Sequence, residues 1–176
     1  MHCEEIKKIV SNFSLIRECD TILNGMLRLS TPFQNIEGSF IDLYIGEQND
    51  LYSPYILTDL GGTSAYLFDM NIKLYATKKR KRIMHDICVS LGVIEDNGEF
   101  KIPIGKEELK ELPEAIVRLS QACIRIKEKI RNVKKLYEQA KHKAESGNFA
   151  YQLAKLSLES HLEELLQIEK NNRKMI

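Results

Sequence analysis

Apolar and polar residues alternate most regularly over residues 39–45, SFIDLYI. Ile41, Leu43 and Ile45 would face one side of an extended chain, and this period of two predicts a β-strand. A polar loop follows, and the apolar segment 55–60, YILTDL, comes after it. We expect these two strands to pair as an antiparallel hairpin, which a third strand extends.

The rest of the N-terminal part is predicted to be helix and loop. Over residues 3–29, apolar residues recur at intervals typical of a helix, in one or two pieces. The segment STPFQNIEGSF is expected to be a loop. Pro32 restricts the residue before it to an extended conformation, and Gly38 supplies a turn.

Two further helices and a second hairpin are predicted next. Residues 63–71 are compatible with a short helix. The segment TKKRKRIMHDICVSLG is predicted to be a longer helix, with Thr77 as its N-cap and Gly92 as its C-terminal stop. In VIEDNGEFKI, Asn97 and Gly98 are the pair preferred in a type I′ hairpin turn, because both central residues need a positive φ.

From Pro113 onward the apolar spacing predicts helix. Intervals of three and four alternate without a break, which is the a/d seam of a heptad repeat over about four heptads. The seam consists of Ile116, Leu119, Cys123, Ile126, Ile130, Val133, Tyr137 and Ala140. Residues 145–148, ESGN, interrupt it, and a second helix is predicted over about 149–171. The seam needs a partner helix, which is the final helix folded back, a second protomer, or both.

These elements predict an α+β fold, with a small antiparallel sheet and helices followed by a C-terminal helical hairpin or coiled-coil-like extension. The boundary is placed between an α+β domain of residues 1–112 and an extension of residues 113–176. The seam positions from Ile116 to Tyr137 are the candidate interface for a homo-oligomer or a protein partner. The alternative is a helical hairpin that packs on the chain's own α+β domain.

The composition is that of a globular protein, with 43% hydrophobic and 29% charged residues in 176. No apolar run approaches the roughly 20 residues that span a membrane, and residues 1–10 lack the apolar core of a signal peptide. We therefore expect a cytoplasmic protein with no membrane partner. The four cysteines, Cys3, Cys19, Cys88 and Cys123, are expected to be reduced and buried as small hydrophobic residues.

The net charge of +1 hides an uneven distribution. Residues 1–72 carry ten acidic and four basic side chains, whereas residues 73–82 carry six basic ones and no acidic one. A second basic stretch covers residues 101–143. This asymmetry is the main electrostatic indication of a partner.

Five consecutive basic residues begin the predicted helix after Thr77, and they are Lys78, Lys79, Arg80, Lys81 and Arg82. The helix dipole disfavours positive charge at this end, so the placement invites a functional explanation. With the following hairpin as a wing, the region resembles part of a winged helix, and a nucleic-acid backbone is a possible partner. The alternative is a solvated face that offsets the acidic N-terminal half.

Two aspartates are the candidates for catalysis. Asp42 and Asp59 lie on the paired strands, and neighbouring carboxylates can hold a divalent metal for hydrolysis. The favoured alternative is that Asp59 caps the turn at Gly61 or the helix that follows it. His85 and Cys88 are only half of a zinc site, so no metal and no cofactor are expected.

A family resemblance is carried by the segments TPFQNIEGSFIDLYI, YILTDLGGT, KRKRIMHDICVSLGV and LPEAIVRLSQAC. They resemble the prokaryotic domain-of-unknown-function family 1828 over about residues 10–130. The resemblance implies a small α+β fold from bacteria or mobile elements and no established activity. The chain departs from the family pattern at Leu60, where an acidic residue is common, and in its long helical tail.

The function favoured by the sequence is therefore a non-enzymatic interaction protein of a phage, prophage or other mobile element, which binds a protein partner. Nucleic-acid binding through residues 78–82 is the first alternative. A metal-dependent hydrolase that uses Asp42 and Asp59 is the second.

Overall fold

The computed structural model of the chain describes residues 2–10, 14–22, 25–145, 155 and 158–159. The chain forms two compact units, Met1–Arg131 and Asn132–Ile176. The fold described below is that of the first unit. The predicted second helix of the extension, residues 149–171, lies almost entirely outside the described residues.

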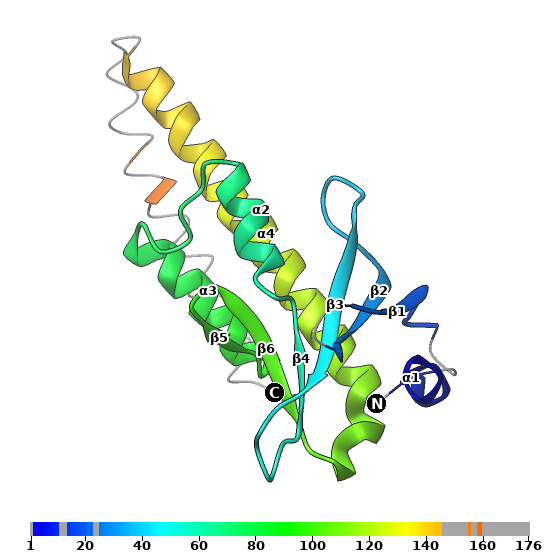
Figure 1. Cartoon of the computed structure of the whole chain (residues 1–176). Coiled ribbons are helices and arrows are strands. Elements are labelled where there is room, and N and C mark those ends of the chain that lie inside the picture. Colours follow the sequence, from blue (N-terminus) through cyan, green and yellow to red (C-terminus); the bar gives the residue numbers. More distant parts are fainter. Residues whose placement is uncertain (1, 11–13, 23–24, 146–154, 156–157, 160–176) are drawn as a thin grey trace, which may run out of the picture. The chain divides into compact units, whose positions relative to one another are not determined.

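A six-stranded antiparallel sheet with the order β1-β2-β3-β4-β6-β5 is the centre of the first unit. Its strands are β1 (Glu18–Thr21), β2 (Leu27–Gln34), β3 (Phe40–Glu47), β4 (Tyr55–Thr58), β5 (Ile94–Asp96) and β6 (Glu99–Ile104). Figure 1 shows the strands side by side, with the helices gathered around them. The predicted α+β fold and both predicted hairpins are confirmed.

The N-terminal part differs from the prediction. Only its first piece is helical, as α1 (Cys3–Val10), and β1 and β2 occupy the part expected to continue the helix. The predicted loop at residues 30–40 is mostly strand, because β2 continues to Gln34 with a register shift between Ser30 and Gln34. This irregular stretch accommodates Pro32, which cannot donate a ladder hydrogen bond.

The register of the first hairpin places the two candidate aspartates. Tyr44 of β3 lies opposite Thr58, the last residue of β4. Asp42 is therefore two residues beyond the end of this ladder, and it pairs with Ser30 of β2 on the other side. Asp59 is the first residue after β4, so the two aspartates are not a directly opposed pair.

Helix α2 (Gly62–Asp69) follows β4 after a tight turn. Helix α3 (Lys78–Leu91) has both capping residues that the sequence predicts, and it begins at the N-cap Thr77. The Thr77 hydroxyl accepts a hydrogen bond from the backbone N–H of Arg80 at 3.2 Å. Gly92 ends α3 with φ 61°, and the Asn97–Gly98 turn has φ angles of 52° and 88°. Both glycines occupy conformations that other residues rarely adopt.

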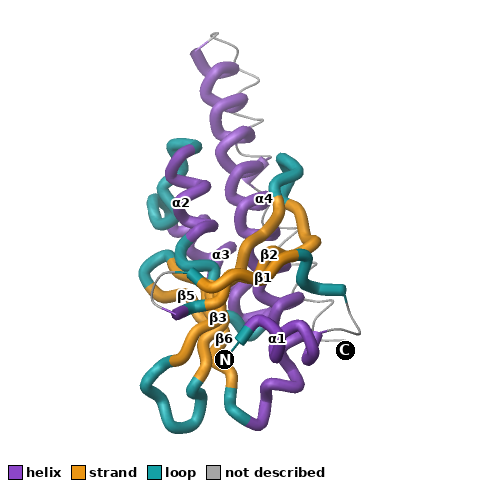
Figure 2. The backbone as a smooth tube through the Cα atoms, turned by 45° about the vertical axis from the view of Figure 1, so that its right-hand side comes forward, coloured by secondary structure: helices purple, strands orange, loops and turns teal. Residues whose placement is uncertain are grey.

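A short 3₁₀ helix, η3 (Glu107–Glu111), leads into the long helix α4 (Leu112–Glu145). Figures 1 and 2 show the first half of α4 running along the sheet. Five seam residues of this half are buried, namely Ile116, Leu119, Cys123, Ile126 and Ile130. Each of the leucine and isoleucine side chains contributes about 1.5–3 kcal/mol of hydrophobic stabilisation to the chain's own core. Within the described residues, no helix is both long and apolar enough to cross a membrane.

The seam therefore behaves differently along its length. Its first five side chains are covered by the same chain and are not available to a partner. In the second unit, Val133 is partly exposed and Tyr137 is 66% exposed. Among the described seam positions, exposed side chains that could form a docking surface begin at Val133.

The expectation for the cysteines is wrong for two of the four. Cys3 of α1 and Cys19 of β1 form a disulfide, with their Cα atoms 5.7 Å apart. Cys88 and Cys123 are free and buried, as expected. The prediction failed because it assumed reduced thiols and placed both residues in one helical region, whereas β1 turns back beside α1.

Candidate functional site

Asp59 is the centre of the hydrogen bonding that follows β4. Its side chain is buried, with 4% of the residue exposed. One carboxylate oxygen accepts hydrogen bonds from the backbone N–H groups of Gly61 and Phe100, and the other accepts one from Thr63, each at 2.9 Å. The thiol of Cys123 lies 3.8 Å from the second oxygen. The carboxylate thus ties together the turn, α2, β6 and α4.

This geometry explains the sequence DLGGT. Leu60 and Gly61 have positive φ angles of 47° and 73°, which a non-glycine residue such as Leu60 adopts only at a cost. The Asp59 carboxylate holds the turn from inside, and the Thr58 hydroxyl accepts a further hydrogen bond from the Leu60 N–H at 3.0 Å. The contacts of Asp59 are therefore those of a turn and cap residue.

The metal hypothesis has little support from this arrangement. A divalent ion at Asp59 would compete with three backbone donors for the same two oxygens. Asp42 is partly exposed and lies 3.9 Å from the guanidinium of Arg28. In the described part of the chain, no three His, Cys, Asp or Glu side chains form a group that could hold a metal ion.

His85 and Cys88 do not form half of a metal site either. They are three residues apart on α3, but His85 is exposed and Cys88 is buried. Burial raises the pKa of the Cys88 thiol to about 11, which keeps it protonated and a poor ligand or nucleophile at neutral pH.

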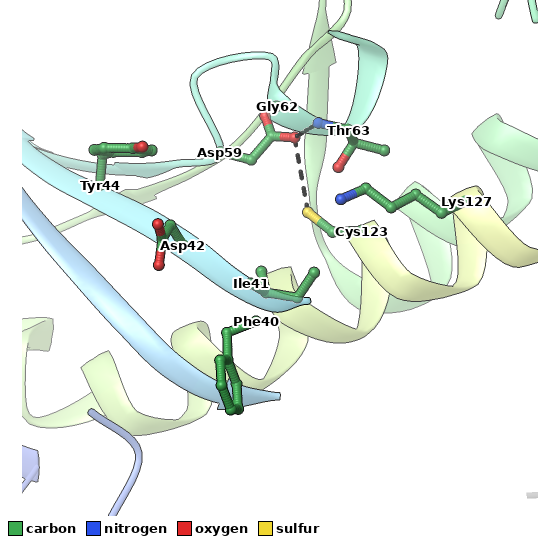
Figure 3. Close-up of a pocket in the computed structure, with 9 residues that line it drawn as sticks. All are labelled: Phe40, Ile41, Asp42, Tyr44, Asp59, Gly62, Thr63, Cys123 and Lys127. Atoms are coloured by element: carbon green, nitrogen blue, oxygen red, sulfur yellow. Dashed lines mark hydrogen bonds between the residues drawn. The ribbon is translucent and has the colours of Figure 1, made fainter. Parts of the chain in front are cut away.

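A pocket of about 170 Å³ lies between β3, the Asp59 turn, α2 and α4 (Figure 3). Its lining consists of Phe40, Ile41, Asp42, Tyr44, Asp59, Gly62, Thr63, Cys123 and Lys127. It contains both candidate aspartates, together with a threonine, a cysteine and a lysine that sequence reasoning did not place there. Cys123 and Lys127 are one helical turn apart on α4. The heptad pattern indicates that Cys123 faces the core, but it gives no such indication for Lys127.

Lys127 is the cation of this pocket. Its ammonium lies 4.9 Å from the centre of the Tyr66 ring, which is a cation–π contact. Burial lowers the pKa of Lys127, and the negative charges of Asp59 and Glu37 offset part of this effect. Burial raises the pKa of the neighbouring Cys123 thiol far above its usual range, and the Asp59 charge raises it further. Cys123 is therefore a neutral hydrogen-bond donor and not a nucleophile.

The second candidate site is the start of α3, where the basic residues 78–82 lie. Arg80 donates a hydrogen bond to the backbone oxygen of Lys73 at 2.9 Å, and Arg82 lies 3.9 Å from Asp86. Among the residues that the structure describes, Lys78, Lys79 and Lys81 form no ion pair. Three positive charges at the positive end of the helix dipole thus have no local compensation.

The second hairpin is fixed next to these helices. The Ser64 hydroxyl of α2 donates to the Gly98 backbone oxygen at 2.5 Å, and the Gly98 N–H donates to the Glu95 carboxylate at 2.8 Å. The Tyr75 hydroxyl, from the segment between α2 and α3, donates to the same carboxylate. Sequence reasoning found the Asn97–Gly98 turn but not its two long-range partners, Ser64 and Tyr75.

The comparison with protein families gives one result. The family model described as "Domain of unknown function DUF1828" matches residues 31–126, just over half of the chain. The chain belongs to this family. No curated protein and no solved structure matches the chain.

The DUF1828 match confirms the resemblance carried by the sequence motifs. It includes the Asp59 turn, α2, α3 and the second hairpin, so both candidate sites lie mostly in the family's domain. It ends at residue 126, one residue before Lys127, and it excludes the disulfide between Cys3 and Cys19.

Proposed function

We propose that this DUF1828 protein binds duplex DNA through the start of α3. The observation that carries the proposal is the cluster of Lys78, Lys79 and Lys81, which have no ion-pair partner among the described residues. Positive charge at a helix N-terminus costs about 0.3–1 kcal/mol per residue. A bound polyanion would offset this cost in free energy, because its negative charges would neutralise the lysines.

The surrounding topology supports this choice by analogy of fold. Strand β4, helices α2 and α3, and the hairpin β5–β6 follow one another, and β6 pairs with both β4 and β5. This is the connectivity of a winged helix. In helix-turn-helix proteins the second helix enters the major groove, and its N-terminal residues contact the DNA. The corresponding positions in this chain are residues 78–82.

The expected mode is contact with phosphates, with little sequence readout. The cluster contains no Asn or Gln that would read adenine, and lysines mainly supply charge. The hairpin carries Glu95, Asp96 and Glu99, and these acidic side chains disfavour contact with phosphates. The interface is therefore limited to α3 and the segment before it.

The test is fluorescence anisotropy of a labelled DNA duplex at about 50 and 200 mM salt. We expect micromolar or tighter binding at low salt, with log K falling by about 0.9 per phosphate contact as log salt rises. Lys78→Ala, Lys79→Ala and Lys81→Ala together should abolish detectable binding. The matched control is Lys7→Ala, Lys106→Ala and Lys110→Ala, which removes the same charge from other exposed positions.

Two outcomes would refute the proposal. One is no binding at low salt by the unmodified chain. The other is equal weakening by both triple variants, because this would indicate a diffuse charge effect and no site at α3.

Binding of a protein partner through the heptad seam has less support. Five of the seven candidate interface positions are buried in the chain itself, which leaves Val133 and Tyr137. The homo-oligomer, the mobile-element origin and the cytoplasmic location remain predictions from the sequence.

A further inference from the structure

Two polar groups in the pocket beneath the Asp59 turn have unused hydrogen-bonding capacity. Thr63 is 1% exposed, and its hydroxyl has no hydrogen-bond partner. The Lys127 ammonium makes a ring contact with Tyr66 but no ion pair or hydrogen bond to the described residues. Figure 3 shows both groups directed toward the same region, from α2 and α4, with the Cys123 sulfur beside them.

Buried polar groups in folded proteins are nearly always hydrogen-bonded, so the Thr63 hydroxyl calls for a partner. The half-buried Lys127 ammonium is directed to the same region and can bind the same group. A single oxygen acceptor between them would satisfy the hydroxyl and one ammonium proton together. The Cys123 thiol lies against the Asp59 carboxylate at 3.8 Å, and its sulfur is only a weak acceptor for the Thr63 hydroxyl. A strong acceptor for this hydroxyl must therefore come from outside the protein.

Lys127 favours an anionic acceptor, although the lining also contains Asp42 and Asp59. The Asp59 charge is already spread over three backbone donors at 2.9 Å, and Asp42 lies 3.9 Å from Arg28. Glu37 lies 3.3 Å from Arg131. Lys127 is thus the cation of the pocket that lacks a direct counter-ion.

The volume and the remaining lining limit the size and shape of the ligand. A cavity of about 150 Å³ can hold a benzene molecule, and this pocket measures about 170 Å³. Ile41 provides an apolar wall away from Lys127, as Figure 3 shows. The space suits a head group with a short apolar tail.

We propose that this pocket binds a small organic carboxylate, whose oxygens accept hydrogen bonds from Lys127 and Thr63 while its tail contacts Ile41. The site is distinct from residues 78–82, and it does not depend on DNA binding. An alternative occupant is an ordered water, which can bridge two such groups.

The test is isothermal titration calorimetry of the full chain with acetate, butyrate and benzoate, each against its neutral amide, at constant ionic strength. Butyrate or benzoate should bind at least tenfold more tightly than its amide. Lys127→Met should abolish this preference, and Thr63→Val should weaken carboxylate binding at least threefold. Arg125→Met, which removes an exposed cation from the same helix, should leave it unchanged.

Three results would overturn the proposal. The first is the absence of carboxylate binding, which would assign the space to water only. The second is equal binding of acids and amides. The third is an equal loss of carboxylate binding in the Arg125→Met control. If Lys127→Met does not fold, Thr63→Val decides the question, since valine has the same shape as threonine and lacks only the hydroxyl. DNA binding by residues 78–82 is measured separately, so the failure of one proposal does not affect the other.

Discussion

Asp59 accepts a hydrogen bond from the backbone N–H of Phe100 at 2.9 Å, although 41 residues separate them in the sequence. The backbone N–H of Asp59 donates in return to the Phe100 carbonyl oxygen at 3.0 Å. These two bonds join the end of β4 to β6 at the point where the ladder would otherwise stop. Phe100 is fully buried, so the junction belongs to the core.

Removal of the Asp59 carboxylate is expected to destabilise the protein strongly. In Asp59→Ala, the N–H groups of Gly61, Thr63 and Phe100 lose their acceptor, and each buried unsatisfied donor costs about 1–3 kcal/mol. We expect a loss of roughly 3–5 kcal/mol in the free energy of unfolding, against roughly 1–2 for Asp59→Asn, which keeps one acceptor oxygen. Urea denaturation measures both values, and a loss below about 0.5 kcal/mol in Asp59→Ala would contradict this role.

Much of the middle of the chain could be predicted because its signals are local. The strand β3, the Thr77 and Gly92 caps of α3, and the Asn97–Gly98 turn each depend on a few neighbouring residues. The Asp59 turn was predicted for the same reason, and the loss of such a cap alone typically costs about 1 kcal/mol. The larger cost follows from Phe100, which the sequence does not place near Asp59.

The parts of the fold that were predicted wrongly depend on long-range pairing. Strand β2 contains Leu27 and Leu29 at a spacing of two, but the apolar residues before it also suit a helix, and only pairing with β3 and β1 decides between the two. The pocket could not be predicted for a similar reason, because Lys127 lies 64 residues after Thr63 in the sequence. A charged residue on a helix is usually solvated, and no local signal distinguishes this one.

The hairpin turn gives a prediction with an internal control. Gly98 has φ 88°, and a Cβ atom there would lie 2.9 Å from the Ser64 hydroxyl oxygen. Gly38 has a similar φ of 81°, with no atom within 4 Å of the Cβ position. Gly38→Ala should cost about 1–2 kcal/mol from backbone strain alone. Gly98→Ala should cost more by roughly 1 kcal/mol, since crowding also breaks the bond from Ser64.

The comparison of these two variants by thermal or urea unfolding isolates the contact with Ser64. Equal losses in both would mean that the hairpin does not depend on its attachment to α2. Ser64→Ala should then also be neutral, whereas we expect a loss of about 1 kcal/mol.

The disulfide between Cys3 and Cys19 closes a short loop, since the two residues are 16 positions apart. Restriction of the unfolded chain by a loop of this size contributes about 3 kcal/mol in the chain-entropy treatment. The oxidised protein should therefore lose about 2–3 kcal/mol of stability when a reductant is added. Cys3→Ser should be equally destabilised and should not respond to the reductant, and a response would show that another thiol is involved.

A thiol titration tests the assignment of all four cysteines. Cys88 and Cys123 are buried, and burial raises the pKa of Cys88 to about 11. At pH 8 only about one Cys88 in a thousand is a thiolate, because three pH units separate the two values. We expect no rapid reaction with a disulfide reagent in the native protein, two thiols after unfolding, and four after unfolding with prior reduction. Four thiols without reduction would refute the Cys3–Cys19 bond.

Finally, removal of the lysines at the start of α3 should stabilise the protein. Lys78 and Lys79 lie in the first turn of the helix, where the dipole is positive and no acidic residue is present. Lys79→Glu replaces an unfavourable charge with a favourable one, so we expect a gain of about 0.5–1.5 kcal/mol at low salt. The gain should shrink in about 1 M salt because screening weakens surface charges. The same variant should bind DNA less well, and a loss of stability would mean that Lys79 has a structural contact instead of a functional one.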